Sequence, residues 1–449
     1  LGPDGWFYWT KGAFAEQRHT LSDGREFVTR AAHIFRSRPD GTLFEPVLTG
    51  GMDNPVGVSF TSAGERFLCG TFFQIPAAGR RDGIIHSVYG GVYGKENAAS
   101  DGHIRTGDLM PIMTHMGAAA PCGTTVYRST GFGSAFTDNL FVCYFNLRKI
   151  SRHELIPDGA TYRTKDSDFL TSDHPDFRPT DVLEDADGSL LVVDTGGWYK
   201  ICCPTSQLAK PDVLGGIYRI RRDGAPRVAD PRGLKLPWVK MDAVALAQLL
   251  GDPRPDVRDR AMFRLGQQGA SAVPVLVRAA KPPSSVESRR NAIWTLARIS
   301  GPEARAAVRT ALNDPSPEIV RTALNVASLW RDALAAPAVI PLLANTDPQL
   351  ARLAAETLGR TAAVAAVPKL LDAAARIPER GSVSATGSPE DQSIRVAEHA
   401  IIHAMIQIGA TEPLFESLKL AREPRRTRAA LVALDQLSPK AFAATDVLP

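Results

Sequence analysis

The residues FRPTDVLEDADGSLLVVDTGGWYK (177–200) and GGIYRI (215–220) contain three short apolar runs that are separated by turn residues. Asp187-Gly188 lies between two β-favouring runs, and this dipeptide is a strong signal for a tight hairpin turn. The stretch therefore predicts one complete antiparallel unit of short strands. After about Lys240 the pattern becomes helical, so the same stretch also lies near the border between two halves of the chain.

Earlier in the chain, a turn followed by a short strand recurs several times, as in Gly2-Pro3-Asp4-Gly5 before Trp6 and in Pro39-Asp40-Gly41 before Thr42. Regularly spaced strands without helical periodicity indicate an all-β repeat fold. Units of four strands would lie near residues 1–50, 53–115, 121–175 and 176–225. We therefore predict a β-propeller over residues 1–238. Its first unit is expected to lack the innermost strand, which predicts a propeller that is incomplete at its N-terminus.

The second half has a helical repeat. Alanines recur at positions 261, 292, 323 and 354, and each step is 31 residues (292 − 261, 323 − 292, 354 − 323). Three Asp-Pro pairs, at 252–253, 314–315 and 347–348, can each open a helix, because Asp caps a helix and Pro suits its first turn. The spacing predicts an α-solenoid of the HEAT type, with about six units over residues 239–449 and a C-terminal end that is expected to be incomplete.

Composition excludes some classes of function. The chain has 449 residues and a formal charge of +4, with no dense basic run interleaved with aromatics, so nucleic-acid binding is not expected. No apolar run reaches the roughly 18 residues that a membrane-spanning helix needs. Five cysteines occur without C-x-x-C spacing, which excludes a zinc finger and a haem-attachment motif in this chain. They are either small buried hydrophobic residues or members of one or two disulfides.

Four short motifs carry a resemblance to a known family. They are GPDGWFY (2–8), GMDNPVGV (51–58), APCG (120–123) with DNLFV (138–142), and RPTDV (178–182). In this order they resemble motifs of the quinoprotein glucose/sorbosone dehydrogenase propellers. More closely, residues 1–222 resemble the planctomycete-type membrane-bound dehydrogenase family, in which such a propeller precedes HEAT repeats and often a c-type haem domain.

The resemblance implies an enzyme that oxidises a sugar or related alcohol outside the cytoplasm, in the periplasm or a similar compartment. The implied cofactor is pyrroloquinoline quinone (PQQ) with Ca²⁺, and haem c would belong to a domain outside this chain. In that interpretation Arg178, Asp53 and Asn54 contact the cofactor and His115 is catalytic. Two positions depart from the family: Asp53 stands where it has an arginine that faces the quinone, and Thr180 stands where it has the second arginine of its R-x-R-D-V motif.

Each of these residues also has a structural interpretation. His115 lies in a long loop among methionines and can be an ordinary buried histidine. Arg178 can form an ion pair with a neighbouring aspartate, and Asp53-Asn54 before Pro55 can simply start a turn. An alternative function is therefore a non-catalytic propeller that binds carbohydrate or protein on a HEAT scaffold.

The solenoid offers a further surface for a partner. Its helices carry a ridge of arginines that could face an acidic protein or could simply be solvated, namely Arg258, Arg260, Arg289, Arg290, Arg321 and Arg352.

Overall fold

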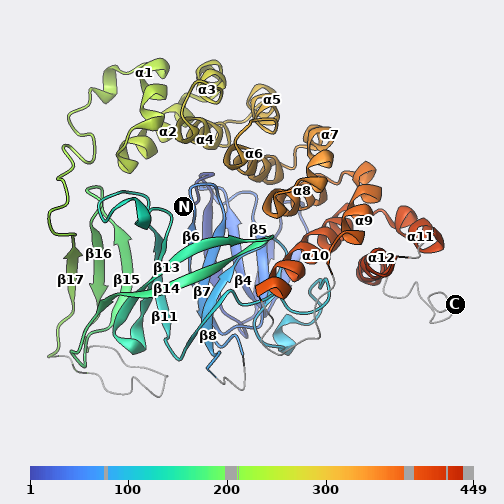
Figure 1. Cartoon of the computed structure of the whole chain (residues 1–449), viewed down its shortest axis with the longest axis horizontal. Helices are drawn as coiled ribbons and strands as arrows, with labels where there is room; N and C mark the ends of the chain where they lie inside the picture. The colour runs from blue at the N-terminus through green and yellow to red at the C-terminus, as the bar shows by residue number, and fades with distance from the viewer. Residues whose placement is uncertain (75–78, 198–209, 211, 379–388, 421–422, 438–449) are drawn as a thin grey trace.

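A computed structural model describes residues 1–74, 79–197, 210, 212–378, 389–420 and 423–437. It contains a β-sheet-rich region followed by a region of helical repeats (Figure 1). Within these residues no helix combines the length and the apolar character that a membrane span needs.

The β-sheet-rich region contains four main sheets within the described residues. The first has the order β1 (Phe7–Lys11), β4 (Ala32–Ser37), β5 (Glu45–Gly50) and β9 (Val92–Tyr93). The second has the order β10 (Thr114–Gly117), β8 (Asp82–His86), β7 (Arg66–Thr71) and β6 (Asn54–Phe60). The third consists of β11 (Pro121–Val126), β12 (Leu140–Tyr144), β13 (Lys149–Asp158) and β14 (Thr161–Thr171), and the fourth of β15 (Pro179–Glu184), β16 (Leu190–Asp194) and β17 (Gly216–Ile220). A separate hairpin joins β2 (Gln17–Thr20) to β3 (Glu26–Thr29).

The stretch that opened the sequence analysis folds as predicted where it is described. Strands β15 and β16 pair antiparallel, with Leu183 opposite Leu191, and Gly188 in the turn has a φ of 78° that suits glycine. The Asp187 side chain accepts a hydrogen bond from the Ser189 N–H at 3.0 Å. The segment 198–209, with both Cys202 and Cys203, lies outside the described residues. Each of the four predicted units supplies most strands of one main sheet, although β9 of the first sheet lies in the second unit. Closure of the sheets into a ring stays a prediction.

The sheets pack face to face through apolar side chains. Phe67 of the second sheet and Val142 of the third belong to one buried cluster, and Phe141 and Val182 join the third sheet to the fourth. Successive residues of a strand point to opposite faces, so β12 contributes to both clusters. The first strands of the last three sheets lie side by side, because β11 packs between β6 and β15.

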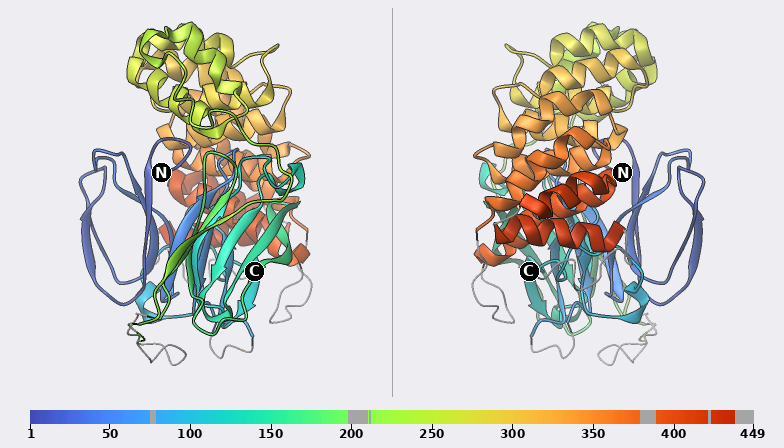
Figure 2. Two further views of the ribbon diagram at one scale, coloured as in Figure 1. Left: turned by 90° about the vertical axis from the view of Figure 1, so that its left-hand side faces the viewer. Right: turned by 90° about the vertical axis from the view of Figure 1, so that its right-hand side faces the viewer.

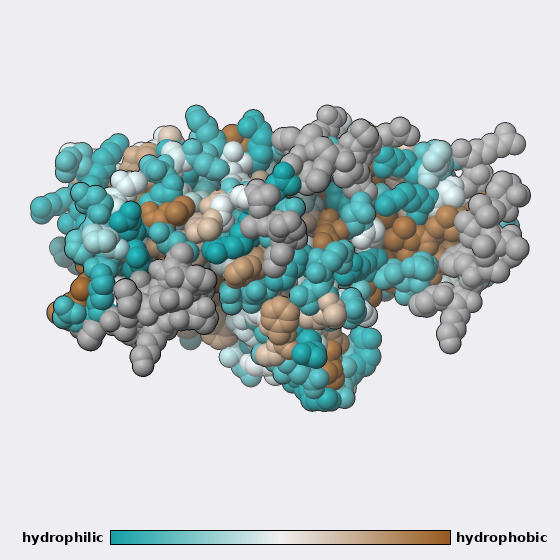
Figure 3. Space-filling view, turned by 90° about the horizontal axis from the view of Figure 1, so that it is seen from below, coloured by the Kyte–Doolittle hydropathy of each residue, from teal (hydrophilic) through white to brown (hydrophobic). Residues whose placement is uncertain are grey.

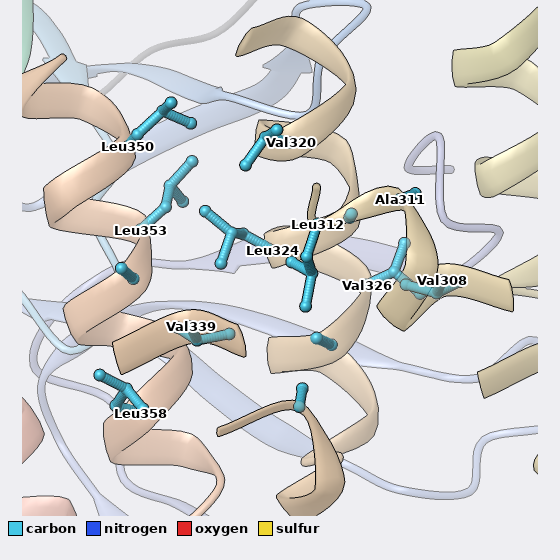
Figure 4. Close-up of a cluster of buried hydrophobic side chains, with 14 of the residues drawn as sticks. Val308, Ala311, Leu312, Val320, Leu324, Val326, Val339, Leu350, Leu353 and Leu358 are labelled. Carbon is cyan, nitrogen blue, oxygen red and sulfur yellow. The ribbon is translucent and has the colours of Figure 1, made fainter. Parts of the chain in front are cut away.

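The helical region is a row of paired helices around one continuous apolar core. Its helices are α1 (Ala243–Gln248), α2 (Pro255–Gln268), α3 (Val273–Ala279), α4 (Val286–Leu296), α5 (Pro302–Ala311), α6 (Pro317–Trp330), α7 (Ala336–Val339), α8 (Pro348–Arg360), α9 (Val367–Ala375), α10 (Pro389–Ile408), α11 (Thr411–Leu420) and α12 (Pro424–Leu437). Ala261, Ala292, Ala323 and Ala354 are all fully buried, which confirms the 31-residue repeat. Leu312, Leu324 and Leu353 show how neighbouring repeats interlock (Figure 4).

Only one of the three Asp-Pro pairs stands at the start of a helix as predicted. Asp347 caps α8, accepting a hydrogen bond from the Gln349 N–H at 2.9 Å, and Pro348 is the first helical residue. Helices α2 and α6 instead begin at Pro255 and Pro317, two residues after the prolines of the motif. There the aspartate closes a turn before the helix, as Asp314 does by accepting from the Ser316 N–H at 2.8 Å.

The helical repeats lie against one end and one side of the β-sheet region (Figures 1 and 2). Trp294 of α4 donates to the Ser62 carbonyl at 3.0 Å, and Asn325 of α6 donates to the Ala63 carbonyl at 3.2 Å. These two side chains occupy the same position of successive repeats (325 − 294 = 31) and bind the same turn between β6 and β7. Val396 of α10 joins a core cluster of the sheets, so the halves share apolar as well as polar contacts.

Candidate functional site

The sequence-predicted cofactor residues lie at one end of the sheets. Asp53 directly precedes β6, Asn54 is its first residue, and Arg178 directly precedes β15; β6 and β15 lie on either side of β11. The opposite end of β6 leads into the turn that α4 and α6 cover. We call the uncovered end, where β6, β11 and β15 start, the strand-start edge. The side of the molecule away from α1 to α8 is largely hydrophilic with separate apolar patches (Figure 3).

Asp53 is paired with a lysine that the sequence did not single out. The Lys95 ammonium lies 2.5 Å from Asp53 Oδ1, and both side chains are mostly buried. Two glycines allow this approach, because a Cβ on Gly12 would lie 2.1 Å from the Asp53 carbonyl oxygen and a Cβ on Gly51 would lie 2.1 Å from that of Lys95. The negative charge at position 53, where the resembling family has a cation, is therefore neutralised within the protein.

Two phenylalanine rings flank the Lys95 ammonium. Its nitrogen lies 5.7 Å from the Phe14 ring centre and 5.3 Å from that of Phe72, distances that permit cation–π attraction. Both phenylalanines have positive φ, 82° at Phe14 and 59° at Phe72, a conformation that bulky residues rarely adopt. Strain of this kind persists where surrounding structure enforces it and is frequent at ligand sites. Phe14, Asp53, Phe72 and Lys95 form what we call the Lys95 cluster.

Arg178 contacts residues at the neighbouring ends of β15 and β16. Its N–H donates to Asp194 Oδ1 at 2.8 Å and its guanidinium to the Phe177 carbonyl at 3.0 Å. The guanidinium also lies 5.7 Å from the Phe145 ring centre. A cavity of about 500 Å³ borders Phe177 and Asp194, so a ligand could reach the neighbourhood of Arg178. Asn54, which is exposed, donates to Thr71 Oγ1 at 3.0 Å.

His115 does not join these residues. It lies on β10, at the outer edge of the second sheet, whereas Asp53 and Asn54 lie at β6 on the inner edge. Two strands separate β10 from β6, which corresponds to about 14 Å at the usual strand spacing. Partial burial lowers the pKa of His115, so its imidazole is neutral at pH 7. A catalytic role for His115 stays a prediction that this placement does not favour.

The described cysteines, Cys69, Cys122 and Cys143, are unpaired thiols that lie near the strand-start edge. Cys69 Sγ lies 3.1 Å from the Cys122 carbonyl oxygen. Burial raises the pKa of Cys122 to about 12 and raises that of the other two thiols. Since the thiolate is the reactive form, these cysteines act as buried apolar residues rather than nucleophiles.

Two glutamates at the junction between the halves were not anticipated. Glu65, at the end of the β6–β7 turn, accepts from Arg352 at 2.5 Å and from His86 Nε2 at 2.9 Å. Glu45 lies against three arginines. Burial alone would raise the pKa of each carboxyl group, but the neighbouring cations hold both well below their usual range. The sequence could not identify these groups, because each glutamate has at least one arginine partner that lies more than 280 residues away along the chain.

Most arginines of the predicted ridge on the solenoid are paired within the protein rather than solvated. Five of its six members are bound to carboxylates within the protein. The pairs are Arg258–Glu287, Arg289–Asp314, Arg290–Glu318, Arg321–Asp347 and Arg352–Glu65. The sixth, Arg260, stacks 4.5 Å from the Trp238 ring centre. Most of these pairs link one repeat to the next, and the last links the solenoid to the sheets.

Family models match both regions of the chain. A domain of unknown function, DUF7133, matches residues 1–222, and a HEAT-repeat model matches residues 243–330. No curated protein matches the chain.

Among solved structures, a "putative oxidoreductase (glucose dehydrogenase)" of Thermus thermophilus is 20% identical with a TM-score of 0.32, covering 49% of this chain and 62% of that one. A designed armadillo repeat protein is 18% identical with a TM-score of 0.28, covering 44% of this chain and 100% of that one. The CpcE–CpcF complex of phycocyanin lyase from Nostoc sp. PCC7120 is 18% identical with a TM-score of 0.27, covering 49% of this chain and 96% of that one.

Proposed function

We propose that the β-sheet-rich region is a propeller that binds a sugar or related polyol at its strand-start edge, and that the HEAT-type solenoid is the scaffold that holds it. The family resemblance implies a location outside the cytoplasm, and we include that location in the proposal. The observation that carries the proposal is the Lys95 cluster. Two phenylalanines in strained backbone conformations flank a lysine–aspartate pair at the end of the sheets that α4 and α6 do not cover.

The chemistry of this cluster suits a polyhydroxylated ligand. Aromatic rings offer apolar faces against which the C–H face of a sugar can pack, and Phe14 is 47% exposed. Lysine supplies hydrogen-bond donors and aspartate supplies acceptors, so the pair can form hydrogen bonds with several hydroxyl groups at once. Because Lys95 and Asp53 neutralise one another, the site favours neutral over charged ligands.

The residues present do not fit PQQ with Ca²⁺. The carboxylates of PQQ need free cations, yet Lys95 is bound to Asp53 and Arg81 holds Asp82 with two contacts of 2.8 Å. Arg178 donates to the Phe177 carbonyl. No group of three or more His, Cys, Asp or Glu side chains in the described part of the chain could hold a metal ion. No step of a reaction is therefore derived through this cofactor.

The test is calorimetric titration of the full chain with neutral mono- and oligosaccharides. We expect Phe72→Ala and Lys95→Met each to weaken binding by about tenfold or more, since each removes one side of the site. Phe263→Ala is the matched control, because Phe263 is 57% exposed on α2 in the solenoid. Absence of binding to every neutral sugar, or binding that Phe72→Ala leaves unchanged, would contradict the proposal.

A second candidate is quinone-dependent oxidation of that sugar or alcohol, which would require the quinone carboxylates to displace the present partners of Lys95, Arg81 or Arg178. It is favoured by the positions of Asn54 and Arg178, which lie at the starts of strands on either side of β11, where the family resemblance places cofactor contacts. Titration of PQQ with Ca²⁺ should then give stoichiometric binding that Arg178→Ala abolishes. Sugar binding without quinone binding would leave the protein a non-catalytic carbohydrate-binding module.

A further inference from the structure

A groove of about 600 Å³ runs between the two halves. The β2–β3 hairpin and β5 form one wall, which includes Phe27 and Thr49. The end of α6, the end of α8 and the last turns of α10 form the other wall, which includes Arg331, Arg360 and Gln407. We call it the arginine groove. Its volume lies in the range of about 300–1,000 Å³ that is usual for small-molecule sites.

Positive charge exceeds negative charge at the base of this groove. Glu45 accepts from Arg36 Nε at 2.7 Å, from Arg331 Nη2 at 3.0 Å and from Arg360 Nη2 at 3.0 Å. One carboxylate therefore faces three guanidinium groups, which leaves an excess of two formal positive charges in this set of four side chains. Of the three arginines, Arg331 and Arg360 line the groove and Arg36 does not. Arg331 is suited to meet a ligand, because its side chain is 55% exposed while that of Arg360 is 1% exposed. A groove with this excess of arginine N–H donors matches a carboxylate, which accepts from arginine in bidentate geometry.

The groove also contains neutral hydrogen-bond acceptors. His33 Nδ1 donates to the Leu48 carbonyl at 2.9 Å, since a carbonyl can only accept, and its Nε2 therefore accepts from the Thr29 hydroxyl at 2.7 Å. The Thr29 oxygen must then accept from His103 Nε2, at 3.2 Å. Burial lowers the pKa of His103, which favours the neutral ring, and with Nε2 donating the other nitrogen, Nδ1, is an acceptor.

A second acceptor lies across the groove. Gln407 Oε1 is buried, lines the groove and has no hydrogen-bond partner among the residues that the structure describes. A buried acceptor without a donor costs free energy, which a ligand hydroxyl could recover. His103 Nδ1 and Gln407 Oε1 can both accept hydrogen bonds from a ligand, whereas the exposed Arg331 guanidinium can bind an anion.

We propose that the arginine groove binds an acidic sugar, that is, a carboxylate-bearing sugar of one or two residues. Its carboxylate lies against Arg331, and its hydroxyl groups donate to His103 and Gln407. The lining of this groove shares no residue with the Lys95 cluster, and the proposal does not depend on that cluster. The groove differs in chemistry as well, because the Lys95 cluster has no net charge.

The experiment is titration of the full chain with galacturonate, digalacturonate and gluconate, beside neutral galactose and inorganic phosphate. We expect an acidic sugar to bind, galactose not to compete for the same site, and binding to weaken as salt is raised. Arg331→Gln should weaken binding by about tenfold or more. Arg331→Lys should restore part of it, since it returns the charge without the planar fork.

The control is Arg232→Gln. The side chain of Arg232 is 54% exposed and is likewise bound to a carboxylate, that of Asp185, outside the groove. Gln407→Leu is a second variant that leaves every ion pair intact and should also weaken binding. The proposal is overturned if no acidic sugar binds, if Arg331→Gln and Gln407→Leu leave binding unchanged, or if phosphate binds as tightly as the acidic sugars. Because neutral sugars and Phe72→Ala report on the other site, failure of one proposal is distinguishable from failure of the other.

Discussion

Individual buried ionic groups connect the two halves of this protein. Glu65 is only 4% exposed and contacts Arg352 of α8 and His86 of β8. A buried charge is tolerable only while its partners remain, because its desolvation is then offset by their attraction. Such groups are therefore sensitive points at which single substitutions should have large effects.

We predict that Glu65→Ala lowers the free energy of unfolding by about 3–5 kcal/mol, because it leaves Arg352 buried without its carboxylate. Chemical denaturation measures this change. Glu26→Ala is the control, since the Glu26–Arg18 pair is exposed and should leave the denaturation midpoint unchanged. Equal effects of the two substitutions would show that the Glu65 network does not hold the halves together.

His403 predicts a dependence of stability on pH. Burial, followed by the nearby Arg360, lowers the pKa of His403 to about 4 from an ordinary value near 6.5. Between these values the unfolded chain binds a proton that the folded protein does not, so stability is lost as the pH falls from 6.5 towards 4. The contribution is about 1.4 kcal/mol per pH unit.

His403→Gln should therefore reduce the fall of the thermal midpoint between pH 6.5 and pH 4.5. His174→Gln, at an exposed histidine, should leave that fall unchanged. If both variants follow the parent protein at every pH, His403 does not titrate as inferred.

For single residues, the sequence predicted which side chains would be buried better than it predicted which side chains would contact one another. Ala261 and its repeats are buried as the 31-residue spacing predicted. Asp53 was recognised as an unusual residue at its position, but Lys95, which neutralises it, lies 42 residues away in a loop whose path no local pattern specifies. Of the proposed Lys95 cluster, the sequence therefore singled out Asp53 and did not single out Lys95 or the two phenylalanines.

Single elements follow the sequence closely, with differences at their ends. Helix α8 begins at Asp347-Pro348 as predicted, whereas α6 begins at Pro317, because Asp314 closes a turn instead of capping the helix. The Asp347 carboxylate has two functions, since it also lies 2.6 Å from Arg321 of the preceding repeat. Sequence predicted the cap and missed the link between repeats.

Two substitutions at position 347 separate these functions. Asp347→Ala removes both cap and ion pair and should lower the free energy of unfolding by about 1–2 kcal/mol, which is the usual range for loss of a cap. Asp347→Asn retains an N-cap side chain and should cost less. Denaturation of both variants under the same conditions tests this order, and equal losses would assign the whole effect to the Arg321 pair.

In the molecule as a whole, the two predicted regions pack against each other. Sequence predicted a β-rich half and a helical half, and both are present. It could not predict that α4, α6 and α8 would use one face of the solenoid to hold the sheets, because such contacts join residues more than 230 positions apart.

We predict that the two halves unfold together. Calorimetry of the full chain should show a single main transition, because Val396 lies in the core of the sheets and the Glu65 network is buried between the halves. Glu65→Ala should weaken this coupling and broaden or split the transition. Two well-separated transitions in the parent protein would contradict the prediction.

The contacts of Trp294 and Asn325 with one turn have a consequence for how this protein can evolve. A freestanding solenoid can gain or lose a repeat by duplication or deletion, because each unit touches only its neighbours. Here an extra 31 residues between α4 and α8 would carry Arg352 one unit beyond Glu65 and misalign every later helix with the sheets. The number of repeats between Trp294 and Arg352 is therefore fixed by the β-sheet region, and copy-number change is tolerable only towards the ends of the array.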